Sequence, residues 1–291
     1  MGTLRLTAAD LRGFSAPPKV RNLHNGYRSA SWTAPAKLAD GCRERIFDVV
    51  ADVATRTFET DHSNYWKARK EQNFFDQVSN FTLTLAPDDE VVGWAGYQRK
   101  RFFGKRVVYL DAAGLLPAHR RSKLSARVQA RFLITEVLLR NPFGHTYVVL
   151  RTQNPGIHAG FTKTFGPDRV FPQPDRPVPE QVQRLGVAAM RWLGHRPEQI
   201  DAEKLVVREA LGGLLSQLYG QAPRSGDPEL DGFFAERIGT TDCFALITKA
   251  SAGPLLAFMA REASRQAATR LGRHLGVALG GVRHARRRVS R

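Results

Sequence analysis

The 291-residue sequence has few cysteines, no long hydrophobic run and comparatively few acidic residues. Cys42 and Cys243 are its two cysteines, too few for a disulfide framework and too far apart in sequence for a short metal-ligand motif. No stretch approaches the ~18 uncharged apolar residues of a membrane-spanning helix. The first residues lack the apolar segment of a secretory signal. We therefore expect a cytoplasmic protein.

Several short catalytic signatures are also missing. The sequence contains no His-Glu-x-x-His, Cys-x-x-Cys, Gly-x-Ser-x-Gly or Walker lysine loop. These absences argue against a zinc protease, a dithiol redox centre, an α/β-hydrolase and a P-loop nucleotidase. We expect no metal cofactor.

Basic residues are in large excess, with 44 Lys and Arg against 27 Asp and Glu and a net charge of +17. Such a surplus attracts polyanions, whether nucleic acid, anionic lipid or a polyphosphate cofactor, without choosing among them. From residue 254 onward hydrophobic residues alternate with arginines, and residues 283–291 hold five arginines. This pattern is typical of an amphipathic helix that packs on its own domain and ends in a solubilising tail. The alternative is an anchor on an anionic membrane surface.

The order of predicted elements favours a mixed α/β (α+β) fold, with a mostly antiparallel sheet, flanking helices and a helical C-terminal extension. Hydrophobic periodicity predicts two helices, Asp40–Phe58 and Tyr65–Val78, followed by three strands, Phe81–Leu85, Val91–Arg101 and Lys105–Leu116. Next come a helix over Lys123–Leu139, a strand over Thr146–Arg151 and two helices, one from Asn154 and one over Glu180–Leu193. The last elements of the domain are a strand over Lys204–Leu211, a helix over Asp227–Ile238 and a strand over Cys243–Lys249. We divide the chain into an N-terminal arm (1–40), one α/β domain (41–250) and a basic amphipathic helix with an arginine-rich tail (251–291).

A basic turn lies between the predicted strand Lys105–Leu116 and the next helix. Its cations are Arg120, Arg121 and Lys123, and its small residues are Ser122, Ser125 and Ala126. The first N–H groups of a helix have no partner within the helix, and the helix dipole adds positive charge there. The turn therefore predicts a pyrophosphate site, with guanidinium groups beside it. A solvated basic turn without a ligand is the alternative.

The same stretch resembles the signature of GNAT acetyltransferases, in which a hydrophobic residue, any residue and proline precede Arg/Gln-x-x-Gly-x-Gly/Ala. The matching positions are Leu115, Pro117 and the run Arg121-Ser122-Lys123-Leu124-Ser125-Ala126. The resemblance implies that this turn holds the pyrophosphate of acyl-CoA and that the backbone near Leu115 pairs with the pantetheine amides. Leu124 departs from the family, which has glycine there, and it fits if it takes ordinary helical dihedral angles.

A second match begins at Asn154, which is also a predicted helix N-cap with Pro155 behind it. In the family this asparagine contacts pantetheine, and a tyrosine seven residues later commonly protonates the leaving thiolate. Phe161 occupies that position here and cannot donate a proton. His158, three residues earlier on the same helical face, is the substitute we consider, with a solvated surface histidine as the alternative. The two matches cover about residues 40–166.

Asp111 is the best candidate for the base that deprotonates an acceptor amine. It lies in the predicted strand among apolar residues, which favours a carboxyl pKa raised towards neutrality. A structural aspartate in an ion pair is the alternative. Strand alternation would place it on one face with Tyr109 and Ala113. By the position of the family's acceptor site, His62, Tyr65 and Trp66 line the substrate pocket, although Tyr65 and Trp66 also fit simple packing.

The sequence therefore predicts an acyl-CoA-dependent N-acyltransferase that moves an acetyl or longer acyl group to an amine, with acyl-CoA as co-substrate. The alternative is a GNAT-like basic protein that binds nucleic acid or an anionic membrane surface without catalysis. It rests on the hairpin 97–106, where aromatic and cationic residues alternate, and on the departures at Leu124 and Phe161. Nucleic acid is the less favoured partner.

Overall fold

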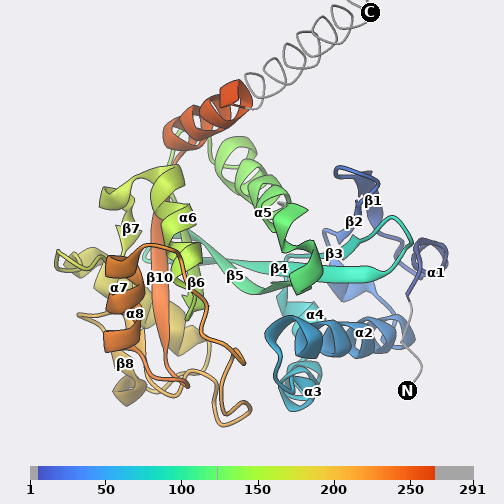
Figure 1. Cartoon of the computed structure of the whole chain (residues 1–291), viewed down its shortest axis with the longest axis horizontal. Coiled ribbons are helices and arrows are strands. Elements are labelled where there is room, and N and C mark those ends of the chain that lie inside the picture. The colour runs from blue at the N-terminus through green and yellow to red at the C-terminus, as the bar shows by residue number, and fades with distance from the viewer. Residues whose placement is uncertain (1–5, 123, 266–291) are drawn as a thin grey trace, which may run out of the picture.

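The computed structural model describes residues 6–122 and 124–265, without the side chains of Arg121 and Ser122. Within these ranges ten strands form one sheet with helices on both faces (Figure 1). In sheet order the strands are β1 (Lys19–Asn22), β2 (Arg28–Trp32), β3 (Asn80–Leu85), β4 (Val91–Phe102), β5 (Lys105–Leu115), β6 (Thr146–Thr152), β10 (Cys243–Ala250), β9 (Val206–Val207) and β8 (Ile200–Asp201), with β7 (Val170–Phe171) also paired to β10. Neighbouring strands run antiparallel, apart from β5 and β6. The predicted fold class is confirmed.

The helices cover the sheet in two layers. They are α1 (Ala8–Arg12), α2 (Asp40–Phe58), α3 (Ser63–Glu71), α4 (Phe74–Gln77), α5 (Leu124–Leu133), α6 (Pro155–Phe165), α7 (Glu180–Trp192) and α8 (Pro228–Arg237). Helices α5 and α6 pack on the face that carries Val108 and Leu150. Helices α2, α3 and α7 pack on the opposite face, where Tyr65 of α3 contacts the clusters of both α2 and α7. In Figure 1, α5 lies across β4 and β5 from α2 and α3.

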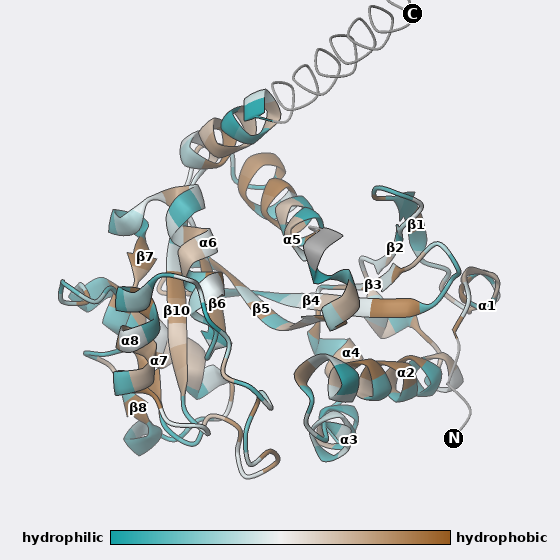
Figure 2. Ribbon diagram, viewed as in Figure 1, coloured by the Kyte–Doolittle hydropathy of each residue, from teal (hydrophilic) through white to brown (hydrophobic). Residues whose placement is uncertain are grey.

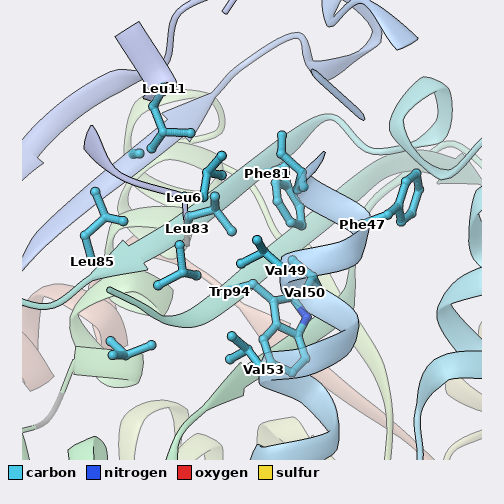
Figure 3. Packing of buried hydrophobic residues seen from close by; sticks show 14 of the residues in the cluster. Leu6, Leu11, Phe47, Val49, Val50, Val53, Phe81, Leu83, Leu85 and Trp94 are labelled. Carbon is cyan, nitrogen blue, oxygen red and sulfur yellow. The ribbon is translucent and has the colours of Figure 1, made fainter. Parts of the chain in front are cut away.

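Helix α2 illustrates how the hydrophobic pattern gives this packing. Val49, Val50 and Val53 recur at helical spacing and are at most 4% exposed. They face Leu83 of β3 and Trp94 of β4 (Figure 3). Each buried valine stabilises the fold by roughly 1.5–2 kcal/mol relative to exposure. In Figure 2, β10 is hydrophobic along most of its length, as expected for a strand covered on both faces.

The N-terminal segment is part of the sheet and does not form the predicted arm. Strand β2 pairs with β3 from Arg28↔Leu85 to Trp32↔Phe81, and β1 continues the sheet beyond it. Thr7 caps α1 with a reciprocal capping box, which joins Thr7 and Asp10. Trp32 at 3% exposure anchors this segment in the core.

Two other predicted elements differ in length. The helix expected over Tyr65–Val78 is broken at Asn73, whose φ of 54° ends the helical path before α4. The strand expected over Lys204–Leu211 is only β9, because Leu205 and Glu209 have positive φ angles and bend the segment. Residues 252–265 are helical. Leu255 packs with residues of α6 and β10, whereas Leu256 and Met259 of the same helix are exposed. The rest of the predicted tail lies outside the described residues, so the choice between packing on the domain and contact with a membrane stays a prediction.

Candidate active site

The parallel strands β5 and β6 part halfway along their length. They pair from Arg106↔Thr146 to Tyr109↔Val149 and no further. Beyond this point β6 pairs with β10, and β5 pairs with β4 as far as Leu115. The edges of β5 and β6 that face each other have no strand partner beyond this point within the described chain. A gap therefore opens in the middle of the sheet, with unpaired backbone on its β5 side.

Asp111 forms a β-bulge at the place where the strands part. Gly96 pairs with Ala112 and Tyr97 with Leu110, so that Asp111 is the extra residue of β5. A bulge bends its strand and increases the local twist. It accounts for the turn of β5 away from β6. Strand alternation predicted Ala113 on the same face as Asp111 and Tyr109, and the bulge makes this prediction wrong for Ala113. Ala113 pairs with Ala95 on the α5 face, whereas Asp111 lies with Tyr109 on the α3 face.

A cavity occupies the gap between β5 and β6, which we call the inter-strand cavity. Its empty volume is about 990 Å³, including the part open to solvent. Under α5 and α6 it is lined by apolar side chains: Leu110, Phe132, Leu150, Ile157 and Phe161. On the opposite face, under α3 and the segment 211–219, the lining includes polar and aromatic residues: Asp111, Arg151, Tyr65, Trp66 and Tyr219. The cavity therefore has an apolar side and a polar side on opposite faces of the sheet.

Asp111 is held by two donors on the polar side. Its Oδ2 atom accepts hydrogen bonds from Arg69 Nη2 and from Gln98 Nε2, the latter at 2.6 Å. Its side chain is fully buried, and Oδ1 has no hydrogen-bond partner within the described residues. The surroundings are therefore not apolar as predicted, since Asp111 forms an ion pair with Arg69. The unpaired Oδ1 leaves one oxygen that can accept a proton or an N–H group.

The three predicted acceptor-site residues, His62, Tyr65 and Trp66, all line the inter-strand cavity. His62 is 1% exposed and stacks on Phe58 at 4.8 Å between ring centroids. Burial lowers the pKa of His62, so that its imidazole is neutral at pH 7. Trp66 and Trp94 both line the cavity, and their indole Nε1 atoms are buried without a hydrogen-bond partner among the described residues.

His158 lies away from the inter-strand cavity, contrary to its predicted role as leaving-group acid. It is 2% exposed, so it is not a solvated surface histidine either. Its Nε2 is 2.7 Å from the carbonyl oxygen of Pro172, to which it donates, and its ring packs on Phe234. Burial lowers the pKa of His158, and its neutral ring therefore has its single N–H engaged. The geometry gives this residue no access to the cavity.

Tyr219 supplies a phenol that sequence reasoning missed. It lines the inter-strand cavity from the segment 211–219, which is fixed to α2 by a 2.8 Å hydrogen bond from Gly220 N to Phe58 O. Burial raises the pKa of Tyr219 to about 12, against a smaller lowering by the side chain of Asn154. The hydroxyl is therefore protonated at neutral pH. No local pattern pointed to this residue, because it lies in a segment without helical or strand periodicity.

Arg151 is a second missed residue. It ends the apolar run of β6, lines the inter-strand cavity and donates from Nε to the Tyr109 hydroxyl at 3.1 Å. A charged residue that closes an otherwise apolar buried strand is a signal that could have identified it. Arg69 and Gln98 gave no such signal, since each stands in an ordinary helical or strand pattern.

The turn after β5 is a 3₁₀ helix, Pro117–Ser122, followed by α5. Leu124, at the position of the family's glycine, begins α5 and is fully buried in the core, so that its side chain points away from the turn. Ser125 and Ala126 are exposed at the helix start. Arg120 donates from Nη2 to Thr57 O at 2.6 Å and from Nε to Leu115 O at 3.4 Å. It therefore ties the turn to α2, in place of the predicted free phosphate clamp.

The remaining phosphate-site residues are less completely described. Lys123 and the side chains of Arg121 and Ser122 lie outside the described part, so their predicted contacts stay predictions. Asn154 is the N-cap of α6, with its side chain accepting from Gly156 N at 2.9 Å, and Pro155 is the first helical residue, as predicted. Its predicted contact with pantetheine stays a prediction.

Among residues 6–122 and 124–265, no group of His, Cys, Asp or Glu side chains is arranged to hold a metal ion. In the same ranges no helix has the length and hydrophobicity needed to cross a bilayer.

Comparison with known proteins finds no matching family model and no matching curated protein. The solved structures that resemble the chain include GNAT acetyltransferases. A histone acetyltransferase HPA2 and related acetyltransferase from Corynebacterium glutamicum is 13% identical, with a TM-score of 0.36 over 52% of this chain and 88% of that chain. YhbS from Escherichia coli, in complex with CoA, is 12% identical, with a TM-score of 0.29 over 44% and 66%. A Brucella melitensis acetyltransferase with acetyl-CoA is 11% identical, with a TM-score of 0.30 over 41% and 74%. At these values the likeness assigns neither an activity nor a substrate.

Proposed function

We propose that the chain is an acyl-CoA-dependent N-acyltransferase whose reaction takes place in the inter-strand cavity. The observation that carries the proposal is the unpaired edge of β5 beyond the Asp111 bulge, which borders the inter-strand cavity. An extended chain with amide groups, such as pantetheine, can add to such an edge as a further strand. The sequence resemblance to GNAT acetyltransferases at Leu115–Ala126 supports the same assignment.

The two sides of the cavity suit the two substrates. The apolar side under α5 and α6 accommodates the thioester arm and its acyl group, and the turn 117–126 receives the pyrophosphate. The polar side under α3 accommodates the acceptor amine. Attack by the amine nitrogen on the thioester carbonyl forms the amide bond and breaks the C–S bond. A backbone N–H on the free edge of β5 stabilises the developing oxyanion.

Two side chains of the polar side handle the protons of this reaction. Asp111 Oδ1, which has no hydrogen-bond partner in the part of the chain that the structure describes, accepts the proton that the attacking amine loses. Tyr219, which is protonated at neutral pH, donates a proton to the departing thiolate. It takes the role for which the sequence suggested His158. We place no metal in this mechanism.

The test is binding and turnover of acetyl-CoA. Calorimetry with acetyl-CoA should give a dissociation constant that rises at least about tenfold in Arg121→Glu, because a cation at the pyrophosphate is replaced by an anion. Arg101→Glu, the same charge change on the β4–β5 hairpin, is the matched control. Native mass spectrometry of protein from cells should show co-purified CoA or acyl-CoA and give the mass of the acyl group. No binding of acetyl-CoA and no thiol release with any amine would overturn the proposal.

A second candidate function, contact with an anionic membrane surface, is favoured by the exposed side chains near the start of β6. Leu139 and Phe143 are 74% and 103% exposed, which is unusual for large hydrophobic residues. Cations lie near His145, two residues after Phe143: burial, and then Lys249, Arg169 and Lys105, lower the pKa of this histidine. Hydrophobic residues between cations suit insertion into a bilayer of anionic lipid. Such contact is compatible with catalysis in the inter-strand cavity.

A further inference from the structure

Arg151 places a positive charge in the wall of the inter-strand cavity, with no negative partner among the described residues. Its Nε donates to the Tyr109 hydroxyl at 3.1 Å, and its Nη1 is 2.8 Å from Ala210 O and 2.9 Å from His195 Nε2. Within the described chain it forms no ion pair with a carboxylate. Nη2 has no hydrogen-bond partner there either. A guanidinium in such a site calls for an anion, because a half-buried charge without a counter-charge is unfavourable.

The groups around Arg151 are neutral at pH 7. Burial raises the pKa of Tyr109 to about 12. Burial, and then Arg151 itself, lower the pKa of His195 to about 4, so that this imidazole is uncharged and accepts through Nε2. Burial also raises the pKa of the nearby Cys243 thiol to about 12. None of these groups offsets the charge of the guanidinium.

The carboxylate of Asp111 does not offset it. Asp111 is paired with Arg69, which lies behind it and does not line the cavity, so Asp111, Arg69 and Arg151 together carry a net positive charge. The Oδ1 atom of Asp111 nevertheless has no hydrogen-bond partner within residues 6–122 and 124–265, and it lies on the same face of the sheet as Arg151. The polar side therefore presents two separate groups: an acceptor oxygen of Asp111, and the guanidinium group of Arg151, whose charge no described residue offsets. A molecule with both an amino group and a carboxylate complements this arrangement.

We propose that the substrate of this cavity carries a carboxylate that binds Arg151. The inference rests on the proposed acyltransferase function and narrows its substrate class. The carboxylate can come from an amino-acid-like acceptor, whose amino group then faces Asp111, or from a dicarboxylic acyl group on CoA. The shared face of Arg151 and Asp111 favours the acceptor as its source.

The test compares matched substrates on the wild-type protein, which avoids any dependence on a variant that fails to fold. One arm uses acetyl-CoA with the twenty standard L-amino acids and with their carboxamides. The other uses succinyl-CoA against acetyl-CoA with the carboxamides as acceptors. CoA release gives kcat/KM for each pair. We expect a preference of about 10- to 100-fold for the carboxylate in one arm, because a charge-assisted contact to a guanidinium is lost with the amide.

A substitution then assigns the preference to Arg151. In Arg151→Met the ratio of acid to amide should fall towards one, and in Arg151→Lys, which keeps the charge but loses the paired geometry, it should be intermediate. Arg191→Met, which removes an exposed arginine of α7 outside the cavity, should leave the ratio unchanged. Thermal unfolding of each variant distinguishes a lost contact from a lost fold.

The outcomes distinguish the proposed role of Arg151 from the proposed acyltransferase function. A carboxylate preference in the first arm that disappears in Arg151→Met supports an acceptor carboxylate, and the same result in the second arm supports an acyl carboxylate. Turnover of acetyl-CoA with carboxamides as efficient as with the acids, and no gain with succinyl-CoA, would overturn the role of Arg151 while leaving the acyltransferase in place. Absence of acyl-CoA binding would overturn both.

Discussion

The indole ring of Trp94 packs against Gly114 on the neighbouring strand, so closely that a Cβ at residue 114 would come within 2.3 Å of ring atom Cη2. The two residues are register partners across β4 and β5. Trp94 also lines the inter-strand cavity. The absence of a side chain at residue 114 therefore sets the position of the ring in the cavity wall.

Gly114→Ala should lower both stability and acyl-CoA affinity. The added methyl group must displace the ring, and overpacking of this kind costs about 1–3 kcal/mol. Urea unfolding measures the first effect and calorimetry with acetyl-CoA the second. Gly232→Ala is the control, because this residue of α8 has open space where its Cβ would stand. Equal stability of Gly114→Ala and wild type would show that the ring moves freely.

Asp111→Asn should reduce kcat at least about a hundredfold while changing acetyl-CoA affinity little, because an amide is a very weak base. The free energy of unfolding should also fall, since Arg69 loses its buried counter-charge; breaking such a pair costs about 3–5 kcal/mol. Single-turnover CoA release and urea unfolding measure the two effects.

The double variant Arg69→Met with Asp111→Leu separates the two effects. Replacing both ions by apolar groups removes the unpaired charge, so much of the lost stability should return. Activity should not return with it. Activity that recovers together with stability would show that Asp111 has only a structural role.

Tyr219→Phe should lower kcat about 10- to 100-fold, because the thiolate loses its proton donor, and should change stability little. The loss of kcat should be smaller for acyl donors whose thiol is more acidic, since their thiolate leaving group needs no protonation. CoA analogues of lower thiol pKa provide this readout. Tyr27→Phe, which removes a hydroxyl 2.7 Å from His119 Nδ1, is the control. Equal losses with every donor would contradict proton donation.

Stability should fall as the pH drops from about 6.5 towards 4. Burial lowers the pKa of His62 and His158, and burial together with Arg151 lowers that of His195 to about 4. As the pH falls, these histidines therefore bind protons at a higher pH in the unfolded chain than in the folded protein. The stabilisation present above about pH 6.5 is lost as the pH falls towards the histidine pKa values of the folded state. Each such histidine contributes a slope of up to about 1.4 kcal/mol per pH unit. Urea unfolding between pH 7.5 and 4.5 measures it, and His195→Gln should reduce the slope.

The surface that carries the exposed side chains Leu139 and Phe143 should bind vesicles of anionic lipid. Sedimentation with vesicles that contain phosphatidylserine should pellet the protein, and vesicles of phosphatidylcholine alone should not. Leu139→Ser with Phe143→Ser should weaken the binding several-fold at unchanged net charge, because the inserted apolar area is lost. If the double variant binds equally well and the wild type binds single-stranded nucleic acid more tightly than vesicles, the surface recognises a nucleic acid.

The sequence predicts the elements that border the inter-strand cavity better than it predicts the cavity itself. Asn154 and Pro155 identify the start of α6, and the valines of α2 identify its buried face, because caps and amphipathic patterns are local signals. The N-terminal strands were missed because short segments with mixed polarity resemble loops. Their strand conformation depends on pairing with β3, which is remote in the sequence.

The residues inside the cavity depend on contacts that no local pattern contains. Alternation with a period of two assigned Ala113 to the face of Asp111, and a single inserted residue in the register reverses it. Asp111 meets Arg69 from a helix 42 residues earlier in the chain. Tyr219 reaches the cavity from a segment without periodicity. Contacts of this kind, between residues far apart in the sequence, determine the chemistry of the site. A single sequence shows which residues are present but does not show which of them come into contact.

The gap between β5 and β6 has a kinetic consequence for the proposed reaction. Because the apolar and polar sides belong to opposite faces of one sheet, we expect the two substrates to bind on different faces and to be present in the cavity at the same time. Initial-velocity plots should therefore intersect, as for a ternary complex, and should not be parallel, as for a covalent acyl-enzyme.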